Sequence, residues 1–120
     1  MGSPSELSEQ MIVVGKLRAA GVLFAAVPNG GRRDRKEGAL LKRSGVQAGV
    51  PDLLIFDSPP QAPQSAGVAL EMKREGSRPS SVSTAQREWL SALEKRGWRA
   101  LVGYGAEDAL KKLSEVGYEL

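Results

Sequence analysis

The chain has 120 residues, of which 41% are hydrophobic and 26% charged, and its formal net charge is +3. These values fit one small domain, so we expect residues 1–120 to form a single domain, with residues 1–4 disordered or left over from cloning. The chain contains no cysteine and no histidine, which excludes disulfides, thiolate or serine-triad catalysis, and zinc sites built on those side chains.

The spacing of apolar residues predicts alternating helices and strands. Helices are expected over residues 5–20, 83–96 and 106–116, with a shorter basic helix ending near residue 45. Strands are expected over residues 22–27, 53–56, 68–73 and 98–102. The apolar stripe of the first helix is expected to contain Leu7, Met11 and Val14, widened by Val13, Leu17 and Ala20. The second and third strands are consecutive and can pair as a hairpin, so the sequence predicts a small mixed sheet with helices packed on it.

One pattern of polar residues falls on the two strands of that hairpin. Pro51-Asp52 opens the first strand, and Glu71-Met72-Lys73 closes the second. Alternate side chains of a strand share a face, so Glu71 and Lys73 are expected to point to the same side of the sheet. In an antiparallel hairpin Asp52 and Glu71 need not meet, and we expect a bend at Pro51 to bring them together.

These side chains are suited to the hydrolysis of a phosphodiester. Carboxylate oxygens prefer Mg²⁺ or Mn²⁺, which lowers the pKa of a bound water and neutralises charge on a phosphate. Lys73 can orient that water or stabilise the transition state. The alternative is structural, because an aspartate after proline often caps a strand and a Glu-x-Lys pattern on an edge strand often faces solvent.

Basic residues gather in two segments of the chain. Residues 32–43 hold six arginines or lysines against Asp34 and Glu37, and a second basic stretch begins at Lys73. Next to a phosphodiester-cleaving site such residues contact the nucleic-acid backbone, whereas on their own they only keep a loop soluble. The residues expected to contact DNA are Asn29, Arg32, Arg33, Lys42, Arg74 and Arg78.

Pro51-Asp52 followed by Glu71-x-Lys73 resembles the signature of the PD-(D/E)XK nucleases. With Val-Pro-Asn-Gly-Gly at 27–31 and Gly-Val-Gln-Ala-Gly-Val-Pro-Asp at 45–52, the chain resembles the VRR-NUC (virus-type replication-repair nuclease) branch of that superfamily. The resemblance implies an α/β fold with a restriction-endonuclease-like core, in which helices flank a small mixed β-sheet. It also implies a DNA endonuclease that needs Mg²⁺ or Mn²⁺, held by Asp52, Glu71 and the Met72 carbonyl.

The same resemblance implies two supporting residues, a glutamate in the first helix and a glutamine that begins a later helix. We expect Glu6 at the site because it shares the stripe that faces the sheet, although Glu6 in a first helical turn also suits the helix dipole. Glu9, interpreted as a solvated partner of Lys16, remains the other candidate. Gln86 has capping-box spacing from Ser83, so it closes that box, contacts the acidic cluster, or does both.

The resemblance thus implies a metal-dependent endonuclease for branched DNA, of Holliday junction resolvase type, in replication, repair or recombination, while the residues themselves do not choose between a junction, a flap, a nick and a plain duplex. The alternatives are a catalytically silent DNA-binding module of the same fold and a domain that only bridges repair proteins. Two symmetric cuts favour a homodimer, joined through residues 38–45 or through Leu110, Leu113 and Val116. No segment resembles a signal peptide or a membrane span, and we expect a cytoplasmic protein, at the nucleoid or in a phage-infected cell.

Overall fold

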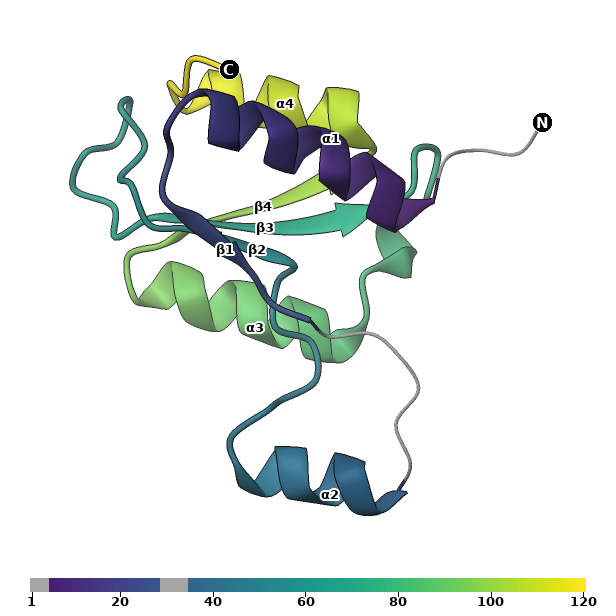
Figure 1. Cartoon of the computed structure of the whole chain (residues 1–120). Helices are drawn as coiled ribbons and strands as arrows, with labels where there is room; N and C mark the ends of the chain where they lie inside the picture. The colour runs from purple at the N-terminus through teal and green to yellow at the C-terminus, as the bar shows by residue number, and fades with distance from the viewer. Residues whose placement is uncertain (1–4, 29–34) are drawn as a thin grey trace.

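The computed structural model describes residues 5–28 and 35–120 (Figure 1). Its elements in chain order are α1 (Glu6–Ala19), β1 (Phe24–Ala26), α2 (Arg35–Arg43), β2 (Leu53–Ile55), β3 (Val68–Lys73), the 3-10 helix η1 (Pro79–Ser81), α3 (Thr84–Lys95), β4 (Arg99–Tyr104) and α4 (Ala106–Glu115). Every expected helix and strand is confirmed, and η1 is the addition. Within the described ranges, no helix is long and apolar enough to cross a bilayer. The expectations for residues 1–4, Asn29, Arg32 and Arg33 fall outside those ranges.

The sheet has four strands in the order β1-β2-β3-β4 across the described residues. The first three strands pair antiparallel, and β3 pairs parallel with β4. A parallel neighbour needs a crossover connection, and α3 supplies it. The expected hairpin and mixed sheet are therefore confirmed, with α1 and α4 on one face of the sheet and α3 on the other (Figure 1).

The core lies between the sheet and the pair formed by α1 and α4. Leu70 and Met72 of β3 are fully buried there and belong to the same cluster as Leu113 of α4. Because side chains alternate along a strand, Glu71 and Lys73 project from the opposite face, on the side of α3. All six residues of β3 are buried, so this strand carries two charged groups into the interior.

The first helix packs with only part of the expected stripe, in which Val13 and Leu17 are buried as expected. Its buried residues include Glu9 and Leu17, whereas Leu7 and Met11 are each 63% exposed. The expectation that Leu7 and Met11 face the core is therefore wrong. The buried stripe consists of Glu9, Val13 and Leu17, and at its N-terminal end the Glu9 carboxylate accepts a hydrogen bond from the Ala106 N–H at the start of α4.

The last helix belongs to the core. Leu113 and Val116 are buried, and Leu110 is partly buried against the same cluster. Since these side chains pack within one copy of the chain, the suggestion that they form a dimer surface is wrong. An amphipathic pattern marks a face that is covered, but it does not distinguish covering by the same chain from covering by a partner.

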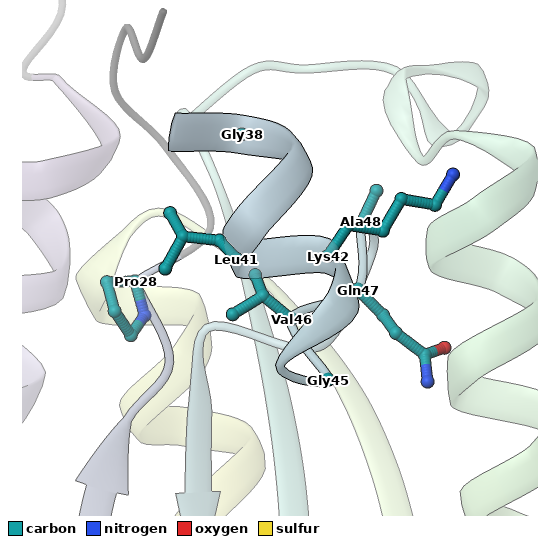
Figure 2. A pocket seen from close by; sticks show the side chains of 8 residues that line it. All are labelled: Pro28, Gly38, Leu41, Lys42, Gly45, Val46, Gln47 and Ala48. Carbon is teal, nitrogen blue, oxygen red and sulfur yellow. The ribbon is translucent and has the colours of Figure 1, made fainter. Parts of the chain in front are cut away.

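The second helix lies apart from the sheet and the other helices (Figure 1). A cavity of about 640 Å³ lies between α2 and the end of β1. Figure 2 shows Leu41 pointing toward Pro28 on one side of the helix and Lys42 pointing to the other side. Neither Asp52 nor Glu71 lines this cavity. Residues 38–45 are largely exposed, so they are the suggested dimer surface that stays available.

A close contact holds the loop before β2 against the first turn of α3. Gly49 has φ +88°, and a Cβ added there would lie 2.7 Å from the backbone carbonyl carbon of Ala85. We therefore expect Gly49→Ala to destabilise the fold by about 3 kcal/mol in urea unfolding, from backbone strain and overpacking together. Gly45→Ala is the matched control, because Gly45 also has a positive φ but open space around it, and its cost should be about 1 kcal/mol. Equal losses in both variants would contradict this contact.

Candidate active site

The hairpin register brings Asp52 and Glu71 together. Leu53 pairs with Leu70, and the next step of an antiparallel ladder sets Asp52 opposite Glu71. The Asp52 Oδ2 atom then accepts a hydrogen bond of 2.7 Å from the Met72 N–H. The backbone also bends at Asp52, directly after Pro51, where a bend was expected. The register of the hairpin could not be predicted, because a long connection between two strands leaves it open.

The two carboxyl groups form a pair whose electrostatics disfavour double ionisation. Burial raises the pKa of Glu71 to about 8, and the neighbouring charge of Asp52 adds to that rise. Burial also raises the pKa of Asp52, against the opposing effect of its hydrogen bond from Met72. When both groups are ionised, Glu71 Oε2 is a buried oxygen without a hydrogen-bond partner among the described residues. A shared proton or a cation would satisfy that oxygen.

The lysine of the motif is also buried, with 8% of its surface exposed. Its backbone is fixed at the carbonyl, which accepts a hydrogen bond of 2.8 Å from the Gly105 N–H. Burial dominates the pKa rise of Asp52 and Glu71, and the positive charge of Lys73 opposes it at both groups. The structure thus brings these three charged side chains into one cluster, in which Glu71 and Lys73 are buried, Asp52 is half-buried, and an isolated charge would be costly.

Gln86 makes both of the contacts considered for it. Its Oε1 atom accepts from the Ser83 N–H at 2.9 Å, and the Ser83 Oγ accepts from the Gln86 N–H at 3.1 Å, which closes the capping box of α3. Its Nε2 atom donates to Glu71 Oε1 at 3.0 Å. The same side chain therefore begins the helix and holds one of the two carboxylates.

The two glutamates of α1 have separate environments. Glu6 is exposed. The pKa values of Asp52 and Glu71 are raised mainly by the burial of those two groups, and the negative charge of Glu6 is a smaller cause that acts in the same direction. Glu9 is only 7% exposed and caps the start of α4 through the Ala106 N–H. The interpretation of Glu9 as a solvated partner of a lysine is therefore wrong. Glu6 is the α1 acid whose charge reaches the carboxylate pair.

Known proteins share both the sequence pattern and the fold of this chain. The family model of the VRR-NUC domain matches residues 5–107. The chain belongs to the VRR-NUC family. A solved structure described as a VRR_NUC domain protein is similar to this VRR-NUC chain, with a TM-score of 0.76 and 24% sequence identity over 98% of this chain and 91% of that chain. That likeness shows a shared fold, and membership of the VRR-NUC family makes it a PD-(D/E)XK-like fold and gives the chain a nuclease-type function. The comparison with curated proteins gives no match.

The carboxylate pair of this VRR-NUC domain fits a Mg²⁺ or Mn²⁺ ion that keeps several water ligands. No three Asp or Glu side chains form a ready-made cage anywhere in the described ranges. Magnesium in phosphate chemistry usually takes one or two carboxylates and fills its other positions with water and substrate oxygens. Asp52 and Glu71 provide that number, and the unpartnered Glu71 Oε2 is an oxygen that a cation would satisfy. The Met72 side chain is buried in the core, so only its backbone carbonyl is available as a further ligand.

The residues expected to contact DNA are distributed over two parts of the domain. Lys42 is exposed on α2, and Arg74 and Arg78 are exposed in the segment that follows β3. That segment begins directly after Lys73, so two of the basic residues lie next to the buried cluster in the chain. Nuclease-type function implies DNA binding, and exposed basic side chains are the groups that contact phosphates in such binding.

Proposed function

We propose that this VRR-NUC domain is an endonuclease that hydrolyses DNA phosphodiester bonds with the help of Mg²⁺ or Mn²⁺. The observation that supports this best is the pair of half-buried Asp52 and buried Glu71, in which Glu71 Oε2 has no donor among the described residues when both groups are ionised, with buried Lys73 in the same cluster. A purely structural pair would be expected to have all its oxygens satisfied by donors. A site that binds a cation only when it works leaves such an oxygen free.

Each residue of the cluster has a distinct part in the proposed reaction. Asp52 and Glu71 would hold the cation, with the Met72 carbonyl as a further ligand. A bound cation of this type lowers the pKa of water and neutralises charge on a phosphate. Lys73 would orient the attacking water and stabilise the charge that builds up on the phosphoryl oxygens. Glu6 would contribute negative charge at the edge of the site.

Gln86 and the basic side chains would have supporting parts. Gln86 keeps Glu71 in place through its Nε2 donor. Asn29, Arg32, Arg33, Lys42, Arg74 and Arg78 are proposed to contact the phosphate backbone. Such contacts orient the duplex without reading its sequence, so the domain would select DNA by shape rather than by base.

The proposed substrate is branched DNA, in particular a four-way junction cut by a homodimer. One copy of the chain has one proposed metal site and would therefore cut one strand at a time. Resolving a junction requires two cuts, on strands that are related by symmetry. A two-fold dimer supplies two sites in that arrangement without added sequence. We propose the exposed segment 38–45 as the contact surface between the two copies of the dimer, because the apolar side chains of the last helix are packed in the core.

A catalytically silent DNA-binding module of the same fold is the second candidate. Such a module would keep basic loops while losing members of the acidic cluster. Here Asp52, Glu71 and Lys73 are all present, and Asp52 and Glu71 are held by specific hydrogen bonds. The nuclease is therefore the better-supported function.

The deciding experiment incubates the protein with labelled junctions, flaps, nicked duplexes and plain duplexes, with Mg²⁺, with Mn²⁺ and with EDTA. We expect metal-dependent cutting of the four-way junction on two symmetric strands, and a mass by light scattering of about twice 12.8 kDa. A monomer that cuts only flaps or duplex would overturn the resolvase proposal and leave the nuclease proposal intact. Binding without cutting under every metal condition would favour the silent module.

A further inference from the structure

The side-chain amide of Gln86 is held at both ends. Its Oε1 atom accepts from the backbone N–H of Ser83 at 2.9 Å, and its Nε2 atom donates to Glu71 Oε1 at 3.0 Å. An amide has an acceptor at one end and a donor at the other, so a bond that fixes the acceptor end also decides what the donor end can reach. The direction of the Gln86 amide is therefore set by Ser83.

We propose that Ser83 is a positioning residue for the cation site, and that its backbone N–H acts through Gln86 on Glu71. This inference rests on the proposed function. With Oε1 of Glu71 already accepting from Gln86, the buried Oε2, which accepts from no donor among the described residues, is the oxygen better placed to bind a cation. The capping box thereby makes Glu71 a ligand through one chosen oxygen.

A capping box alone does not require this arrangement. At the third helical position a glutamate would accept the same hydrogen bond from Ser83, because only the acceptor oxygen takes part in the box. Glutamine is distinguished by its second end, which is a donor aimed here at a buried carboxylate. The contact with Glu71 therefore depends on the amide direction that the box sets, and the N–H of Ser83 connects the two.

Proline at position 83 removes that N–H and leaves the backbone undisturbed. Ser83 has φ −69°, which matches the fixed φ of proline, and Val82 before it has an extended backbone that tolerates a following proline. Ser83→Pro loses both the N–H and the Oγ cap. Ser83→Ala loses only the Oγ cap, and Ser83→Thr keeps both groups. Comparing the three variants separates the positioning bond from ordinary helix capping.

The first measurement follows the side-chain amide of Gln86 by ¹H–¹⁵N NMR in metal-free protein, with its signal assigned from its loss in Gln86→Ala. In the wild type, in Ser83→Thr and in Ser83→Ala we expect a shifted signal with slow proton exchange. In Ser83→Pro we expect the signal of a free amide. A Gln86 signal that stays unchanged in Ser83→Pro would overturn the proposal, whatever the protein does with metals.

The second measurement is the dissociation constant for Mn²⁺ alone, by titration calorimetry without DNA. We expect about 10-fold weaker binding for Ser83→Pro, the usual scale for losing a group that orients a ligand, and less than 3-fold for Ser83→Ala. Tyr118→Phe is the stability control, because it loses a partly buried hydrogen bond to the carbonyl of Asp57, which lies two residues after the end of β2 and away from Asp52. Its Mn²⁺ affinity should equal that of the wild type.

The outcomes separate this proposal from the proposed function. Equal Mn²⁺ affinity in Ser83→Pro and the wild type would refute the positioning role and leave the nuclease proposal standing. A wild type that binds no Mn²⁺ would refute the cation site itself, and the role of Ser83 at it, even where the Gln86 signal responds as expected. Equal weakening in Ser83→Pro and Ser83→Ala would assign the effect to helix capping alone.

Discussion

Asp52→Asn and Glu71→Gln are each expected to reduce cleavage of the junction by at least about 10³-fold, the upper range for losing one preorganised electrostatic group. Each substitution removes an anionic oxygen ligand, and hard cations lose affinity as the ligands lose charge. Both variants should stay folded, because each amide can still accept its existing hydrogen bond, from the Met72 N–H or from Gln86 Nε2. The measurement is single-turnover cleavage together with Mn²⁺ titration.

Lys73→Ala tests the division of labour within the same cluster. Cleavage should fall by at least about 10²-fold, while binding of Mn²⁺ remains, since Lys73 stabilises charge on the phosphate and is not a ligand. Glu94→Gln on the exposed end of α3 is the control for charge removal and should cleave normally. Full activity in excess EDTA, or in Asp52→Asn, would rule out the proposed chemistry.

The order of helices and strands could be predicted from the sequence because it depends on local spacing of apolar residues and on turn residues. The side of β3 that carries Glu71 and Lys73 could be predicted for the same reason, since alternation is a property of the strand itself. The joint role of Gln86 was visible in part, because the capping-box spacing from Ser83 is a local signal. Its contact with the acidic cluster was expected only through the family resemblance, because the bond to Glu71 depends on how α3 packs on the sheet.

Features that depend on contacts between distant segments could not be predicted. Apolar residues occur around much of α1, so periodicity alone did not select the buried face that contains Glu9 and Leu17. Glu9 is buried because its partner is the start of α4, and Ala106 is 97 positions away. The meeting of Asp52 and Glu71 likewise follows from the hairpin register, which the long connection between the strands leaves open.

The carboxylate pair should also make the metal-free protein less stable as the pH rises. Burial raises the pKa of Glu71 to about 8 from an ordinary value of 4.5. Between these values the folded chain holds a proton that the unfolded chain releases, so the free energy of unfolding falls with rising pH. The contribution is fully present below about pH 4.5 and is lost as the pH passes through 8.

Glu71→Gln is therefore expected to be more stable than the wild type at high pH, although it is inactive. The glutamine oxygen can keep the hydrogen bond from Gln86, and its amide nitrogen can donate to Asp52 in place of the unpartnered Oε2. Urea unfolding in EDTA should show a gain of roughly 2 to 4 kcal/mol at pH 9, the scale for replacing a buried unfavourable charge, and little difference at pH 4.5.

Matched conditions identify the source of this gain. Mn²⁺ should stabilise the wild type more strongly as the pH rises, because the ion replaces the proton held by the pair, and it should have little effect on Glu71→Gln. Glu94→Gln should follow the wild type at every pH, since Glu94 is exposed. If Glu71→Gln is instead less stable than the wild type at pH 9, the pair is a structural element whose ionised form the fold favours. The proposal that the pair is a cation site would then lose its electrostatic argument, which is that the ionised pair is unstable in the fold unless an ion binds to it.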